Sequence, residues 1–97
     1  MRKKTFLFDG SEGGSEMLVL ILNHFVDVAF PRGGSDCAAA SRQALQNISD
    51  KISQAELTEI ARRQRPILRS AVKWFYTESV YADPNDPMQE KLLSKLR

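Results

Sequence analysis

The segment from Met17 to Phe30 constrains the fold of this 97-residue chain more than any other part of it. Its only strongly polar side chains are those of Asn23, His24 and Asp27. On a helical wheel these three share one arc of roughly 100° with Glu16, and the rest of the surface is apolar. We expect such a segment to be buried nearly all round, at the centre of the domain.

The length of this apolar run favours a helix from Ser15 to Ala29, with Ser15 as its N-cap. Two strands, Met17–Leu22 and Phe25–Phe30, are the alternative, because valine and phenylalanine suit sheets. The run is too short and too polar to span a bilayer. The basic start of the chain also precedes too short an apolar run for a signal peptide. We therefore expect a cytoplasmic protein with no membrane contact.

Composition predicts one ordinary folded domain over residues 1–97. Apolar residues make up 42% of the chain and charged residues 27%, and the length allows one modest core. The net charge is only +2, so attraction for an anionic partner requires local clustering of cations. Cys37 is the single cysteine of the sequence, which excludes an internal disulfide.

Capping signals indicate two further helices. Ser35 and Asp36 cap a helix that runs to about Asp50, and its thin stripe of small residues suits close packing against the Met17–Phe30 helix. The stripe consists of Cys37, Ser41, Ala44, Leu45, Ile48 and Ile52. Near the end of the chain, a turn over residues 82–87 precedes a short final helix. Asp86 caps that helix, and Pro87 takes its first position.

Residues 1–15 differ from the helical part of the chain. Thr5–Phe8 predicts a short strand with Phe6 and Phe8 on one face. The glycine-rich run from Asp9 to Gly14 predicts a flexible linker. A strand, a glycine loop and a helix in this order imitate a phosphate-binding loop. Since the loop has no Lys-Ser/Thr pair and its acids would repel phosphate, we favour the linker.

The segment from Ser53 to Ser79 predicts a long amphipathic helix. Ser53 and Glu56 form a capping box, in which two side chains satisfy free amides at the helix start. One apolar face then continues past Pro66, which must kink the helix or begin a new one. The sequence thus predicts a mainly all-α single domain of about four helices. Its third helix is kinked or broken at Pro66, and a short strand precedes the helices.

A basic stripe on this helix is the first functional candidate. Between Ile60 and Thr77 there are five cations and no acid. At about 100° per residue, four of the cations and one tyrosine fall on one line beside the apolar face. The line consists of Arg62, Arg65, Arg69, Lys73 and Tyr76. Such a stripe contacts phosphates, an acidic protein or only water.

A resemblance to helix-turn-helix domains gives the stripe a specific meaning. Leu57–Arg63 resembles the first helix of many such domains, and Arg69–Phe75 resembles the recognition helix. Arg65-Pro66 stands where the turn normally carries glycine. The resemblance implies a DNA-binding regulator using residues 57–76. It also implies that Arg65, Arg69 and Lys73 contact phosphates or bases, with Tyr76 beside the DNA backbone.

Protein recognition is the competing interpretation of the same helix. Trp74 and Tyr81 lie on the flank opposite the stripe, near Arg63, and these residue types are enriched at binding hot spots. Leu20 lies inside the polar arc of the Met17–Phe30 helix, where a partner could cover it. We therefore take Trp74, Tyr81, Arg63 and Leu20 as candidate protein-binding residues.

Catalysis and metal binding find little support in the sequence. The only thiol and the only imidazole are those of Cys37 and His24, with Asp27 one helical turn from the histidine. One cysteine and one histidine cannot form a zinc site. The acids around Asp83 and Asp86 lack the spacing of a calcium loop, and capping explains them. We expect no enzyme activity, no cofactor and no small-molecule substrate.

The sequence therefore predicts a small regulatory or adaptor protein that acts by binding. Its partner is another protein or a second copy of itself, and an inhibitor of the phage or plasmid type would have the same features. The alternative is a DNA-binding regulator with a divergent helix-turn-helix at residues 57–76.

Overall fold

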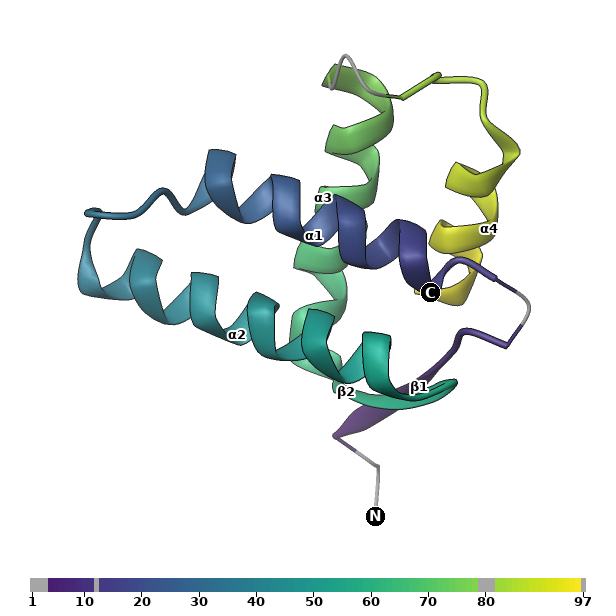
Figure 1. Cartoon of the computed structure of the whole chain (residues 1–97), viewed down its shortest axis with the longest axis horizontal. Helices are drawn as coiled ribbons and strands as arrows, with labels where there is room; N and C mark the ends of the chain where they lie inside the picture. The colour runs from purple at the N-terminus through teal and green to yellow at the C-terminus, as the bar shows by residue number, and fades with distance from the viewer. Residues whose placement is uncertain (1–3, 12, 79–81, 97) are drawn as a thin grey trace.

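A computed structural model describes residues 4–11, 13–78 and 82–96 and shows a mainly helical domain with a small sheet (Figure 1). Its elements, in chain order, are β1 (Thr5–Asp9), α1 (Ser15–Ala29), α2 (Asp36–Gln54), β2 (Leu57–Ala61), the 3-10 turn η1 (Arg62–Gln64), α3 (Arg65–Glu78) and α4 (Pro87–Lys95). None of the helices in these residues is long and apolar enough to cross a membrane.

Helix α1 forms over the expected residues, so the alternative of two strands is wrong. It packs against both α2 and α3, and its buried residues are Leu18, Ile21, Leu22 and Val26. The expectation that it is buried nearly all round is wrong, because Leu20 and Val28 remain 44% and 62% exposed. Its cap is Gly14 rather than Ser15, which is the first helical residue.

Helix α2 begins where the sequence predicted and ends later. The Ser35 hydroxyl accepts a hydrogen bond from the Ala38 amide, as an N-cap serine does. The helix continues past Asp50 to Gln54. Its buried side is narrower than the predicted stripe, because Cys37 is exposed and burial begins at Leu45.

Arg42 of α2 joins the ends of the two helices. Its guanidinium donates to the carbonyl oxygens of Val26 and Phe30 at 3.2 and 3.1 Å, and to the Asp27 carboxylate at 2.7 Å. The last carbonyls of a helix have no partner within the helix. A cation placed there also opposes the negative end of the helix dipole. Arg42 therefore closes the end of α1 and fixes α2 beside it.

The predicted helix from Ser53 to Ser79 is wrong in its first third. Ser53 lies in the last turn of α2, where its hydroxyl donates to the Asp50 carbonyl, so the capping box does not form. Residues 57–61 form a strand instead, with alternating exposed and buried side chains. Pairing with β1 satisfies the backbone groups of Thr58 and Ile60 and buries their side chains, and this outweighs the local helix signal.

Helix α3 begins at Arg65, with Pro66 in its first turn. The amides of a first turn have no acceptor within the helix, so a proline there sacrifices no hydrogen bond. Pro66 therefore stands at the start of a helix, and no helix continues through it. Within α3, Leu68, Val72 and Phe75 face the core, as the predicted apolar face requires.

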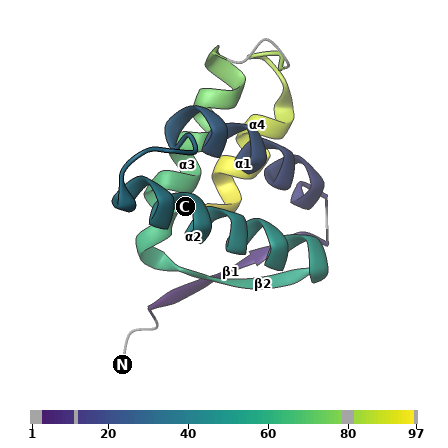
Figure 2. The same ribbon diagram turned by 60° about the vertical axis from the view of Figure 1, so that its left-hand side comes forward.

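The sheet consists of β1 and β2 in antiparallel register, with Phe6 opposite Ile60 and Phe8 opposite Thr58. Phe6 and Phe8 are buried and Leu7 is exposed, which confirms the predicted strand and its inward face. All four helices of the described residues lie on one side of the sheet (Figure 2). The other side of the sheet carries no helix or strand of residues 4–11, 13–78 and 82–96.

Helix α4 confirms the prediction of a short final helix. The Asp86 side chain accepts from the Met88 amide, and Pro87 occupies the first position. The helix packs on α3 and buries Leu92, and Leu96 just beyond its end is also buried. A helix this short gains its stability from such packing rather than from its own hydrogen bonds.

Gly14 links the glycine-rich loop to α1 and α4. Its φ of 99° lies in the left-handed region, which side chains other than glycine adopt at a cost of roughly 1–2 kcal/mol. A Cβ atom at Gly14 would also lie 3.1 Å from the Leu92 side chain of α4. Gly33, between α1 and α2, has a similar φ of 82°, but no described atom lies within 4 Å of its Cβ position.

We therefore expect Gly14→Ala to lower the free energy of unfolding by about 2 kcal/mol or more, and Gly33→Ala by only about 1 kcal/mol. Both variants share the backbone strain, so the difference reports the contact of the loop with α4. Urea denaturation of the two variants measures it. Equal losses would show that α4 does not pack against Gly14.

Candidate functional site

The basic stripe does not form a continuous surface, because its members carry out separate structural tasks. Arg62 belongs to η1; its amide donates to the Lys4 carbonyl, and its Nε donates to the Thr5 carbonyl at 3.3 Å. Arg65 places its guanidinium over the Phe6 ring, 4.4 Å from the ring centre, with its Nε atom buried. Both arginines therefore attach the start of α3 to β1.

Arg69 attaches the middle of α3 to the end of α4. Its Nη1 donates to the Leu93 carbonyl at 3.1 Å, close to the C-terminus of a helix whose last carbonyls need donors. Lys73 is exposed, and no hydrogen bond or ion pair joins its side chain to another described residue. Of the predicted phosphate contacts, Lys73 alone is thus exposed and not engaged in holding α3 in place.

Tyr76 lies in the core and not beside a DNA backbone. Only 1% of its surface is exposed, and its ring contacts that of Phe75 edge to face. Its hydroxyl is buried and has no hydrogen-bond partner among the described residues. Burial and, to a lesser degree, the charge of Asp86 raise the pKa of Tyr76 above its ordinary value of 10.0.

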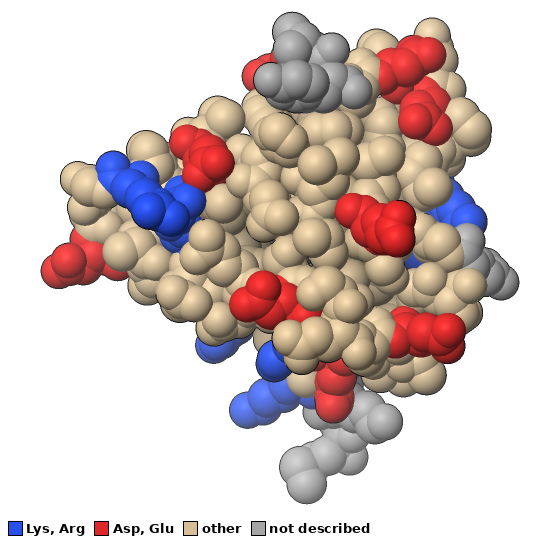
Figure 3. All heavy atoms as spheres, in the orientation of Figure 1, with Lys and Arg blue, Asp and Glu red and all other residues tan. Residues whose placement is uncertain are grey.

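The helix-turn-helix arrangement is not formed at residues 57–76. The segment that would be its first helix is β2, and η1 leads directly into α3. On the face of the molecule seen in Figure 3, acidic side chains are scattered over α1 and α2. Lysine and arginine side chains lie mainly at the margins of this face.

The three candidate protein-binding residues that the structure describes lie on three different elements. Trp74 is half-buried on α3, with its ring 5.7 Å from that of Phe25 on α1. Arg63 is exposed in η1, before the start of α3. Leu20 lies on α1. Tyr81 falls outside the described residues.

Two of the groups considered for catalysis contact other residues of the fold. Asp27 binds Arg42, and the His24 ring lies 6.2 Å from that of Phe75. Cys37 is exposed in the first turn of α2. In the described part of the chain, no group of three or more histidine, cysteine, aspartate or glutamate side chains is placed to hold a metal ion.

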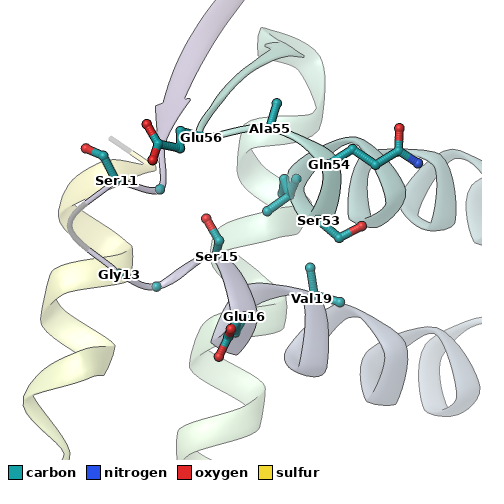
Figure 4. Close-up of a pocket in the computed structure, with 12 residues that line it drawn as sticks. Ser11, Gly13, Ser15, Glu16, Val19, Ser53, Gln54, Ala55 and Glu56 are labelled. Carbon is teal, nitrogen blue, oxygen red and sulfur yellow. The ribbon is translucent and has the colours of Figure 1, made fainter.

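A depression lies where the glycine-rich loop, the start of α1 and the end of α2 meet (Figure 4). Its volume is about 880 Å³. The carboxylates of Glu16 and Glu56 and the hydroxyls of Ser11, Ser15 and Ser53 line it, and its lining includes no lysine or arginine. A phosphate group there would face two carboxylates, so the structure gives no support to a phosphate-binding loop.

The glycine-rich loop beside this depression is fixed by hydrogen bonds from α4. Lys95 of α4 donates to the carbonyl oxygens of Asp9 and Gly13. The Asp9 carboxylate accepts from both the hydroxyl and the amide of Ser11, and these bonds lower the pKa of Asp9. The predicted flexible linker is thus bound at both ends in the described residues.

The outer face of the sheet is the most distinctive exposed surface. We define it by the outward residues of the two strands, which are Thr5, Leu7, Asp9, Leu57, Glu59 and Ala61. Leu7 and Leu57 are diagonal neighbours across the strands, because Leu7 pairs with Glu59 and Asp9 pairs with Leu57. Their side chains are 62% and 59% exposed. Two large apolar side chains therefore adjoin on a face that no described element covers.

Leu7 and Leu57 were not among the candidates from the sequence. The strand pattern is hard to see in residues 57–60. Exposed and buried side chains alternate there only if the polar Thr58 is assigned to the buried face together with Ile60. The threonine hydroxyl makes that burial tolerable by donating to the Lys51 carbonyl at 3.5 Å. The alternation of Phe6-Leu7-Phe8 is hidden because all three residues are apolar.

Comparison of the chain with models of protein families, with characterised proteins and with solved structures gives no match.

We expect Arg69→Met to lower the free energy of unfolding by about 1 kcal/mol, because the Leu93 carbonyl loses its guanidinium donor and keeps only the longer bond from the Leu96 amide at 3.3 Å. Lys73→Met, on the same helix, is the matched control and is expected to change stability by less than about 0.5 kcal/mol. Urea denaturation of both variants tests the assignment. A larger loss from Lys73→Met would contradict the structural role of Arg69.

We expect Tyr76→Phe to leave stability at neutral pH unchanged or to raise it by up to about 1 kcal/mol, because the buried hydroxyl has no described partner. The folded protein holds the Tyr76 proton to higher pH than the unfolded chain does. Wild-type stability therefore falls as the pH rises above 10.0, and the variant lacks this part of the fall. Urea midpoints across the alkaline range measure the difference. A clear loss of stability at neutral pH would show that the hydroxyl has a partner.

Proposed function

We propose that this protein is a non-catalytic binding protein of the regulatory or adaptor class, which docks on another protein through the outer face of its sheet. One observation supports the proposal most strongly: Leu7 and Leu57 adjoin on that face and are each about three-fifths exposed. Single exposed leucines are common on protein surfaces, whereas adjoining apolar side chains on an open sheet face are typical of a contact surface.

The surroundings of the two leucines resemble the rim of an interface. Asp9 and Glu59 flank them on the same face, and Glu56 lies exposed at the start of β2. Lys4 and Arg62 lie at the opposite end of the sheet. An apolar centre with charged residues around it is the usual anatomy of a protein contact, and the unequal charge of the two ends would orient the partner.

Burial of the exposed parts of both leucines contributes about 1 kcal/mol each, which corresponds to roughly a thirtyfold difference in affinity. This gain does not depend on the cations of α3, most of which are engaged within the fold. The same face does not fit DNA, since two of its six residues are acids and none is a cation.

The test uses affinity capture from an extract of the organism that produces the protein, with the captured proteins quantified by mass spectrometry. We expect the double variant Leu7→Ser and Leu57→Ser to lose a partner about tenfold or more, while its helical content stays unchanged by circular dichroism. Val28→Ser is the matched control, because Val28 is as exposed as Leu7 but lies on α1.

The decisive pattern is a partner retained by wild type and by Val28→Ser and lost by the double variant. If the double variant keeps every partner of the wild type, the outer face is not the docking surface. If Val28→Ser loses the same partner, the effect belongs to apolar surface in general, and the proposal is equally wrong.

A further inference from the structure

The register of the sheet determines which backbone groups of each strand face outward. The Gly10 amide donates to the Glu56 carbonyl, and the Arg62 amide donates to the Lys4 carbonyl. Antiparallel pairs alternate between hydrogen-bonded and non-hydrogen-bonded residues. Phe6 and Phe8 therefore bond across to β2, and the amides and carbonyls of the residues between them point away from it.

The outward edge of β1 is blocked by two cations. Lys95 donates to the Asp9 carbonyl, and the Arg62 Nε donates to the Thr5 carbonyl. Only the backbone of Leu7, between them, is left. Cationic side chains laid along an edge are a common device against unwanted strand pairing.

The outward edge of β2 is not blocked in this way. The backbone amides and carbonyls of Leu57 and Glu59 point to this edge. No described residue forms a hydrogen bond with these backbone groups. Both side chains belong to the outer face and are exposed. The β2 edge and the outer face therefore meet along Leu57 and Glu59.

We propose that the β2 edge pairs with an extended segment of a partner protein, which carries a lysine or arginine opposite Glu59 and an apolar residue opposite Leu57. The proposal rests on the proposed function and names the partner's chemistry. Backbone hydrogen bonds would supply affinity, and the alternating side chains would supply specificity. Opposite charges directly across an antiparallel pair stabilise it, and like charges destabilise it.

Charge selects such a partner over a second copy of this chain. Symmetric antiparallel pairing of β2 with itself, in the register that joins the most residues, places Glu59 opposite the Glu59 of the copy. Glu56 and Asp9 add further negative charge at the same end of the sheet. A cationic strand would relieve this repulsion, whereas a second copy would increase it.

Hydrogen exchange of the free protein tests the edge itself. We expect the amides of Leu57 and Glu59 to exchange rapidly and those of Thr58 and Ile60 slowly, because only the latter two are bonded to β1. Slow exchange at Leu57 and Glu59 in the free protein would show that the edge is already occupied. That result would overturn the proposal.

Pairing itself is tested by NMR titration of the whole protein with a short capped threonine-rich peptide that carries one lysine and one valine two residues apart, so that both side chains lie on one face of the added strand. We expect the amide signals of Leu57 and Glu59 to shift and their exchange to slow. Glu59→Lys should weaken this peptide about threefold and favour the same peptide with glutamate in place of lysine. Glu90→Lys, an exposed reversal on α4, is the matched control and should leave both affinities unchanged.

No shift at millimolar peptide, or equal effects of Glu59→Lys and Glu90→Lys, would overturn edge pairing. The proposed function fails separately. In one case, the double variant Leu7→Ser and Leu57→Ser loses the captured partner, but that partner does not protect the edge amides from exchange. Docking on the outer face is then supported, and edge pairing is wrong. In the other case, the peptide protects the edge amides from exchange, but the double variant keeps every partner. Edge pairing is then supported, and docking on the outer face is wrong.

Discussion

The structure depends on the pairing of β1 with β2, which joins residues about fifty positions apart in the chain. This pairing places Phe6 and Phe8 beneath the helices and satisfies the backbone groups of Thr58 and Ile60. It also determines where α3 begins, because η1 follows β2 directly. The same register separates an inward face, which forms part of the core, from an outward face that carries Leu7 and Leu57.

The cations of η1 and α3 show how one sequence pattern can serve several contacts. A helical wheel places Arg62, Arg65 and Arg69 on one line, yet each meets a different neighbour: the β1 backbone, the Phe6 ring and the end of α4. Arginine suits these positions because its planar group can stack on a ring and still donate several hydrogen bonds. These three arginines therefore have carbonyl and aromatic partners within the fold.

The sequence predicted most of the helices and little of the candidate site. Strong apolar periodicity and local caps located α1, α2 and α4, because these signals lie within each segment. The capping box at Ser53 failed because β1, far away in the chain, competes for the residues that follow it. Leu7 and Leu57 were missed for the same reason: their adjacency exists only after the strands pair, and neither segment shows it alone.

The attachment of Lys95 to the loop around Asp9 has a consequence for the order of folding. The α1–α2 hairpin contains only local contacts and can form early, whereas β1 must wait for a partner strand that is synthesised much later. Until β2 and α4 arrive, Phe6 and Phe8 stay uncovered on an unpaired strand. The first strand of the chain is thus the last to find its place, and nascent chains are most prone to aggregate in that interval.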